Sequence, residues 1–363
     1  MMAHTAFTRG MRKALALSAD EQAIMGPLKG FHHDTYVFPL TLPGAEGAGG
    51  RWKCREPRDG LFWFDRRCFP SEAQVIAAVG PRVRRIPGFI NVGDVRLQRF
   101  VEGDTLGASC PADDPVPDRY VRHIMELFGE LVLLRPWNLY LKPGCKPEDR
   151  VREGDTKRFL QRLVSFVQRG VYASHRDEFG VLFASLGVGE ETFRRLYALG
   201  DGMAARPFCL LHADLHRENL IVDLRNELWV IDWELAMFGD PLYDLATHLY
   251  LMRYPEEQER RVIDLWTATV ESGLPGSSRG AERDLSRLLD FKRAQSVFTD
   301  VIRAALHLKA TPDVGTARAD ELTKAVRKTR HVLDQAAKPL GIVPVPEEGE
   351  IRTALEQWLD GSG

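Results

Sequence analysis

The 363-residue chain lacks the run of roughly 20 consecutive apolar residues that a membrane-spanning helix requires. Its first residues interrupt apolar positions with charged ones, so they also lack the apolar core of a secretory signal. It has no excess of one charge either, because 51 Asp and Glu residues nearly balance 49 Lys and Arg residues. We therefore expect a cytoplasmic protein whose partner is neither a membrane nor nucleic acid.

Cysteine is scarce and follows no motif. The five cysteines are widely scattered, and none belongs to a C-x-x-C pair: Cys54, Cys68, Cys110, Cys145 and Cys209. This distribution disfavours a disulfide framework and a zinc site, and it fits a reducing compartment. What the chain does have is the composition of a globular protein, since a hydrophobic content of 44% allows one large unit or two domains.

The first hundred residues alternate between strand-like and helical patterns, whereas most later segments are helical. This order predicts an α+β protein with two lobes, a small antiparallel sheet with one helix and a larger, mainly helical part. The expected elements are a helix within 4–25, a hairpin of strands 35–38 and 51–55 around a loop at 43–50, a helix at 71–79, strands at 89–92 and 95–100, a turn at 102–104, paired strands at 209–211 and 220–222, and a strand at 228–231.

Three hard oxygen donors stand at the ends of the last strands. Asp214 follows the strand at 209–211, Asn219 precedes the next strand, and Asp232 follows the third strand, 18 positions after Asp214. This spacing leaves room for one hairpin, which would bring Asp232 beside the amide oxygen of Asn219. A carboxylate that orients a hydroxyl, together with ligands for magnesium, is what phosphoryl transfer requires of a protein.

These residues belong to the segments LLHADLHRENLIV and WVIDWELAMFGDPLYDLA, which resemble the aminoglycoside phosphotransferase and choline kinase family, relatives of protein kinases. The resemblance implies a protein-kinase-like fold, Asp214 as the catalytic base, and Asn219 and Asp232 as magnesium ligands. His216 is a candidate for the catalytic machinery, with a hydrogen-bonded structural role as the alternative, and we expect His212 to brace the loop. The positions that follow match the family pattern G-D-P-x-x-D-L-A and are expected to brace the site: Gly239, Asp240, Pro241, Asp244, Leu245 and Ala246.

The resemblance also orders the parts of the first lobe. It implies that residues 28–36 cover the nucleotide, that a cation on the second hairpin strand binds the phosphates and pairs with an acid on the next helix, and that residues 98–101 meet the purine. Arg55 is preferred as that cation, and Lys53 on the same strand face stays an alternative. The candidates for nucleotide binding are Gly30, His32, His33, Thr35, Lys53, Arg55, Glu72, Gln98 and Phe100.

We accordingly expect ATP or GTP and magnesium as cofactors. The expected domains are an N-terminal helical extension at 1–21, a nucleotide-binding lobe at 22–103 and a catalytic and acceptor-binding lobe at 104–363. Within the last we place a helical insert at about 111–205, the catalytic core at 206–250 and C-terminal helices at 251–363. The protein is expected to be a monomer or a homodimer.

The acceptor is best predicted as a hydroxyl of a small molecule, such as an antibiotic or a metabolite. Only 12 residues separate Asp232 from Asp244, too few for a long activation loop of the protein kinase type. Acceptor specificity should lie in the helical insert, where Trp137 and Tyr140 either wall the acceptor site or, as we favour, pack in the core. Two alternatives stay open, a Ser/Thr kinase acting on a peptide of a natural-product pathway and a non-catalytic protein that binds nucleotide or a partner.

Overall fold

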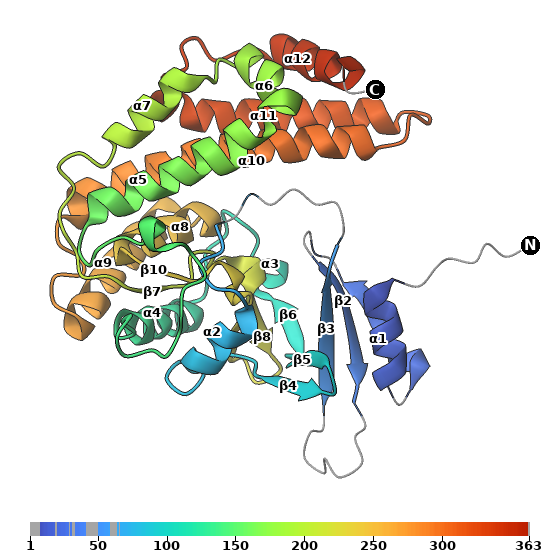
Figure 1. The fold of residues 1–363 in the computed structure, drawn as a ribbon, viewed down its shortest axis with the longest axis vertical. Helices are drawn as coiled ribbons and strands as arrows, with labels where there is room; N and C mark the ends of the chain where they lie inside the picture. The colour runs from blue at the N-terminus through green and yellow to red at the C-terminus, as the bar shows by residue number, and fades with distance from the viewer. Residues whose placement is uncertain are drawn as a thin grey trace, which may run out of the picture.

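The computed structural model describes residues 8–18, 20–28, 30, 33–40, 50–58, 64 and 66–361. Figure 1 shows a sheet at one end of the molecule and a larger helical part beside and above it. This is the α+β arrangement that the order of patterns predicted. Among the described residues no helix is both long and apolar enough to cross a membrane.

The N-terminal sheet has five antiparallel strands in the order β1-β2-β3-β5-β4. Side chains alternate across β3, so that Trp52 and Cys54 are buried on one face while Lys53 and Arg55 lie on the other. That alternation separates the apolar core of the sheet from its polar face. The strands are β1 (Met25–Leu28), β2 (His33–Pro39), β3 (Arg51–Pro57), β4 (Phe89–Val92) and β5 (Val95–Arg99).

The first helix, α1 (Arg9–Leu17), covers the apolar face of this sheet. Ala14 packs there against a cluster that includes Tyr36, Phe38 and Trp52. The helix is shorter than the predicted 4–25 because the chain joins the sheet soon after Leu17, first through a bridge between Ser18 and Leu40 and then through β1. The predicted hairpin of β2 and β3 is present, and of its loop at 43–50 only Gly50 belongs to the described residues.

Helix α2 (Glu72–Val79) follows β3 in sequence but packs with the helical part. Its apolar residues Val75, Ile76 and Val79 belong to the large core cluster that extends through the C-terminal lobe. The sheet has its own smaller cluster. The two cores are therefore separate, and α2 belongs to the second of them.

Two small sheets carry the central motifs, and one predicted pairing is wrong. Strand β7 (Cys209–Leu211) pairs with β10 (Met237–Gly239), not with β8 (Leu220–Asp223), because the intervening loop turns the chain away. Strand β8 pairs with β9 (Leu228–Val230), as predicted, and also with β6 (Gly103–Thr105). The predicted turn at 102–104 is thus mostly a strand. Gly103 permits this pairing, since a Cβ there would lie 2.0 Å from the carbonyl oxygen of Val222.

The remaining chain is helical, as predicted. Figure 1 shows α10 and α11 as a long antiparallel pair, with α5, α6, α7 and α12 alongside them. The helices are α3 (Leu106–Ser109), α4 (Asp118–Val132), α5 (Thr156–Phe166), which continues as the π-helix Val167–Tyr172, α6 (Arg176–Ser185), α7 (Glu190–Ala198), α8 (Pro241–Met252), α9 (Glu256–Gly273), α10 (Ala281–Ala310), α11 (Ala317–Leu340) and α12 (Glu348–Gly361).

Trp137 and Tyr140 correct the core prediction, since their exposed fractions are 69% and 104%. The Trp137 ring instead lies under the guanidinium group of Arg135, 4.4 Å from its centroid. An apolar pattern in a loop does not show on which side the core lies.

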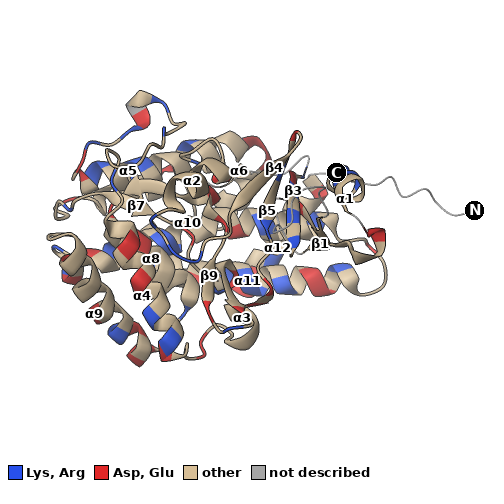
Figure 2. Ribbon diagram, turned by 90° about the horizontal axis from the view of Figure 1, so that it is seen from below, with Lys and Arg blue, Asp and Glu red and all other residues tan. Residues whose placement is uncertain are grey.

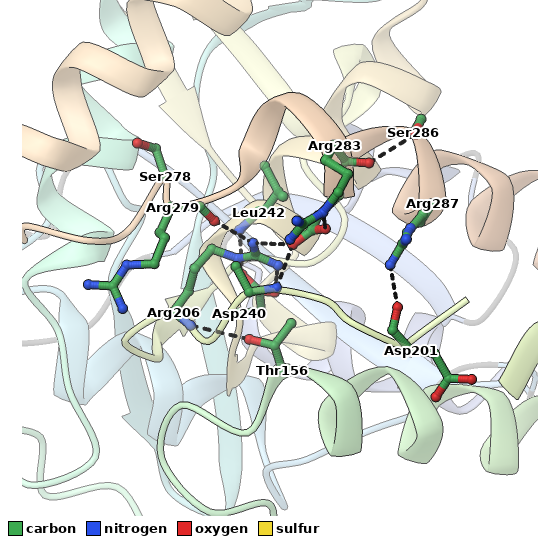
Figure 3. A network of polar contacts seen from close by, with 12 residues as sticks. Thr156, Asp201, Arg206, Asp240, Leu242, Ser278, Arg279, Arg283, Ser286 and Arg287 are labelled. Atoms are coloured by element: carbon green, nitrogen blue, oxygen red, sulfur yellow. Dashed lines mark hydrogen bonds and ion pairs between the residues drawn. The ribbon is translucent and has the colours of Figure 1, made fainter. Parts of the chain in front are cut away.

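A buried ion network joins three segments of the C-terminal lobe (Figure 3). Arg206 donates to both carboxylate oxygens of Asp240, at 2.8 and 2.7 Å, and to Asp284 at 2.8 Å. None of the three side chains is exposed. Asp240 also accepts a bond from the backbone of Leu242 and so caps the start of α8. The network therefore fixes α8, which carries Asp244, against the segment that precedes β7.

Candidate active site

The loop from His212 to Asn219 is held in a strained shape by a buried carboxylate. Ala213 has a φ of 64°, which is rare for a residue with a side chain. Asp244 on α8 accepts the backbone N–H groups of His212 and Ala213 at 3.0 and 2.7 Å. Burial raises the pKa of Asp244 to about 6. These two bonds hold the turn that directs Asp214 out of the core.

His212 braces the same loop from the other side. Its Nε2 donates to the carbonyl oxygen of Ile231 at 3.1 Å, and its Nδ1 accepts from the backbone of Asp214 at 3.3 Å. Burial lowers the pKa of His212, so the ring is neutral, as this pair of bonds requires. The bracing role predicted for this histidine agrees with the geometry.

Asp214 and Asn219 lie together on one loop, as the spacing predicted, and His216 lies beside them. The Asn219 amide nitrogen donates to the backbone oxygen of Asp214 at 2.8 Å and to its Oδ2 at 3.0 Å. The Nε2 atom of His216 lies 3.5 Å from the same Oδ2, and its Nδ1 accepts from the backbone of Glu218. Although burial opposes the charge, Asp214 raises the pKa of His216. The carboxylate of Asp214 is thus oriented from two sides.

Asp232 lies after β9 with a φ of 65°, and Arg55 reaches it from the sheet. The Nη2 of Arg55 is 3.4 Å from Asp232 Oδ1, and its Nη1 is 2.7 Å from Glu72 Oε2. Glu72 Oε1 accepts the backbone N–H of Trp233 at 3.1 Å. Against the effect of burial, Arg55 and Lys53 keep the pKa of Asp232 below its ordinary value. The predicted pairing of Arg55 with Glu72 is present.

Lys53 lies two residues before Arg55 on the same strand face. Within the described part of the chain it forms no ion pair. Burial lowers the pKa of Lys53 to about 8, and the charge of Arg55 acts in the same direction. Both cations therefore face the space between the sheet and the catalytic loop, but only Arg55 is engaged by carboxylates.

A cavity of about 670 Å³, which we call the sheet-side cavity, lies beneath this face. It contains six of the nine residues predicted to bind nucleotide. It is lined by Leu28, Gly30, His33, Thr35, Lys53, Arg55, Arg99, Phe100, Val101, Gly103, Asp104, Thr105, Ala108, Asp214, His216, Glu218, Asn219, Ile221, Ile231, Asp232 and Glu234.

Three predicted nucleotide contacts are not in this cavity. Glu72 lies behind Arg55, and His32 lies outside the described residues. The buried side chain of Gln98 turns toward the carbonyl oxygen of Pro87 at 3.5 Å and lines a neighbouring cavity with Lys53 and Arg55, so a contact of its backbone with the purine stays a prediction. The wall is made by the next residues, 99–101. Two further wall residues, Ile221 and Ile231, were missed, although their places in the strands beside the motif could have indicated them.

A second cavity of about 400 Å³, the helix-side cavity, lies between the catalytic loop and α5, α8 and α10. Asp214, His216, Asp232 and Glu234 line both cavities. Its α10 wall was not predicted, since nothing in that segment differs from an ordinary charged helix. The other lining residues are Arg66, Leu163, Phe166, Ala213, Leu235, Met237, Tyr243, Tyr250, Leu251, Lys292, Gln295, Ser296, Thr299, Asp300 and Arg303.

This architecture is that of the protein-kinase-like phosphotransferases. The model of the phosphotransferase enzyme family matches residues 71–282, more than half of the chain, and the chain belongs to that family. It is therefore an enzyme that transfers phosphate to an alcohol group, as the motifs predicted. No curated protein matches the chain.

Two solved structures with a similar fold extend the comparison. The macrolide 2'-phosphotransferase MphH from Brachybacterium faecium, an apoenzyme, aligns with a TM-score of 0.52 and 15% identity over 93% of this chain and 98% of its own. A thermostable mutant of the aminoglycoside phosphotransferase APH(4)-Ia, in ternary complex with ADP and hygromycin B, aligns with a TM-score of 0.50 and 13% identity over 98% of this chain and 100% of its own. At these identities the likeness concerns the fold.

Proposed function

We propose that this enzyme transfers the γ-phosphate of magnesium-bound ATP or GTP to a hydroxyl group of a small molecule. The observation that carries the proposal is that the two cavities meet at Asp214 and Asp232. The sheet-side cavity has the cations that a triphosphate requires, and the helix-side cavity has room for a small acceptor. A phosphoryl group can then pass from the sheet-side cavity to the helix-side cavity beside Asp214 and Asp232, which line both.

Asp214 orients the acceptor hydroxyl in this proposal. The hydroxyl oxygen forms a bond to the γ-phosphorus while the bond from that phosphorus to the β,γ-bridging oxygen breaks, which leaves a nucleoside diphosphate. The hydroxyl proton passes to Asp214 late in the reaction. Asn219 and His216 hold the carboxylate for this step, so His216 acts on the base and not on the phosphate.

The residues present fit a magnesium ion. The Asn219 amide nitrogen is used by Asp214, which leaves its Oδ1 free to face the cavity, and the Asp232 carboxylate is 29% exposed there. Among the described residues no group of three His, Cys, Asp or Glu side chains could hold a metal without help. Two protein ligands completed by phosphate oxygens suit magnesium, which would neutralise charge on the transferred group.

The remaining contacts bind the nucleotide. Arg55, held by Glu72, and Lys53 would contact the phosphates from β3, while Gly30, His33 and Thr35 cover them from the edge of the sheet. Phe100 and its neighbours at 99–101 would meet the base. The nucleotide-binding lobe then corresponds to the proposed domain at 22–103, with α2 attached to the other core.

The test of this proposal does not need the acceptor. Calorimetric titration with Mg-ATP and Mg-GTP should show binding, and slow nucleotide hydrolysis should be lost in Asp214→Ala while nucleotide affinity is kept. Asp232→Ala should instead weaken Mg-nucleotide binding. An Asp214→Ala enzyme that hydrolyses nucleotide at the wild-type rate would overturn the assignment of the base.

A second candidate, transfer to Ser or Thr of a peptide, is favoured by one observation. A further cavity of about 600 Å³ shares Tyr250, Leu251 and Asp300 with the helix-side cavity, so an extended acceptor has a path along α8, α10 and α11. Phosphate transfer to peptides, compared with transfer to single hydroxylated metabolites, separates the two candidates.

A further inference from the structure

The helix-side cavity is not an acidic site. Glu234 is paired with Arg67 at 2.9 Å, and Asp300 is paired with Lys328 at 3.0 Å, so both carboxylates are neutralised by neighbours. In the proposed function Asp214 takes the proton and Asp232 holds magnesium. Among the described residues, no acidic group that lines this cavity is therefore left to bind a cationic substituent of an acceptor.

Two cations in the same cavity are not neutralised. Lys292 donates to Gln295 Oε1 at 2.9 Å and lies over the Tyr243 ring at 5.5 Å. Arg66 donates to the backbone oxygen of Asp149 at 3.2 Å. Neither forms an ion pair with any residue that the structure describes. Both line the helix-side cavity and neither lines the sheet-side cavity, so they are not placed for the nucleotide.

The wall that carries Lys292 is polar along its length. Lys292, Ser296, Thr299 and Arg303 follow one another at intervals of three and four and therefore share one face of α10, and Gln295 lies beside Ser296 at the same cavity. Charged residues of both signs alternate along the helices elsewhere, as Figure 2 shows, whereas this face offers donors and one paired carboxylate to the cavity. Apolar side chains of α5 and α8 form the opposite surface.

We infer that the acceptor carries an oxyanionic group, a carboxylate or a phosphate ester, that Lys292 and Arg66 bind while its hydroxyl faces Asp214. The inference rests on the proposed function and names the chemical class of the acceptor. A half-buried cation without a carboxylate partner favours an anionic ligand, because the ligand replaces water with a charge-assisted hydrogen bond. Polycationic acceptors would be repelled by the same two groups.

The test uses two matched pairs of probes on the whole enzyme saturated with Mg-ADP, which fills the nucleotide site. D-gluconate is compared with D-sorbitol, and glycerol 3-phosphate with glycerol, by ligand-observed NMR titration; glucosamine serves as the cationic probe. At least one acidic probe should bind more tightly than its neutral partner by about tenfold or more, the usual effect of a hydrogen bond to a charged group. Whether gluconate or glycerol 3-phosphate binds more tightly than its neutral partner shows whether the acceptor's anionic group is a carboxylate or a phosphate ester.

Variants assign the effect to the cavity. Lys292→Met and Arg66→Met should each weaken the acidic probe by about tenfold or more, whereas Lys309→Met, which removes an exposed lysine at the far end of α10, should not. All three variants should keep the Mg-ADP affinity of the wild type. A loss of Mg-ADP binding would report a failure of folding or of the proposed nucleotide site, whereas a loss of the acidic probe alone concerns the acceptor site. The inference is overturned if sorbitol or glucosamine binds as well as the acids, if neither acid binds at millimolar concentration, or if Lys309→Met causes the same loss.

Discussion

Arg206→Met tests whether the buried ion network holds the C-terminal lobe together. The substitution keeps most of the aliphatic volume but removes the guanidinium group that donates to Asp240 twice and to Asp284 once. Both carboxylates are fully buried, so Asp240 would lose its counter-ion without gaining water, and Asp284 would keep only Arg283, at 3.1 Å. Removing one partner of such a pair costs about 3–5 kcal/mol. Each carboxylate keeps one backbone donor, from Leu242 and Ala204, which favours the lower part of that range.

The measurement is urea unfolding followed by tryptophan fluorescence, with Arg283→Met as the matched control. Arg283 also contacts Asp284, at 3.1 Å, but its side chain is 54% exposed, and exposed pairs contribute about 1 kcal/mol or less. Adding Asp240→Asn to Arg206→Met should recover part of the loss, because the charge that Arg206→Met leaves unpaired is then removed. Equal effects of Arg206→Met and Arg283→Met would refute the reasoning.

Three further predictions concern the site. Burial lowers the pKa of Lys53 to about 8, so Lys53 loses its charge as the pH rises above 8. The affinity for Mg-ATP, measured by calorimetry, should then fall by up to about tenfold per pH unit. In Lys53→Arg the affinity should stay level over the same pH range, because arginine keeps its charge. Asp244→Asn keeps one acceptor oxygen but places an amide N–H donor against the other of the two backbone N–H groups, so nucleotide hydrolysis should slow by about a hundredfold with little change in Mg-ATP affinity; equal losses of both would contradict this. Asn219→Ala should raise the magnesium concentration for half-maximal hydrolysis by about tenfold or more, whereas an unchanged requirement would exclude Asn219 as a ligand.

The catalytic loop was predictable from the sequence because its parts are local. Asn219 and Asp232 flank the hairpin of β8 and β9, and Asp214 stands five residues before Asn219 in the same loop, so short-range spacing places the three together. The pair of Arg55 with Glu72 was predicted from family order, and the structure brings the two to 2.7 Å. Local spacing and motif order were sufficient in both cases.

The errors arise where segments that are distant in the sequence determine how a strand pairs or where a side chain points. Gln98 pairs with Lys53 and shares its face of the sheet, but its side chain turns toward the carbonyl oxygen of Pro87 and lines a neighbouring cavity, which no strand pattern shows. Strand β7 pairs with β10 because the turn at Ala213 directs the chain away from β8, and no propensity reports a strained turn. The face of α10 enters the site from another part of the chain, and its pattern predicts only a helix.

The attachment of α2 has a consequence for how the site is assembled. Glu72 is fixed from the C-terminal lobe, since α2 packs in that core and Glu72 accepts the backbone N–H of Trp233 beside Asp232. Arg55 comes from the sheet, whose core is separate. The ion pair of Arg55 with Glu72 therefore joins the two lobes beside Asp232, the proposed magnesium ligand. The short interval between Asp232 and Asp244 predicts that this arrangement does not depend on a long activation loop.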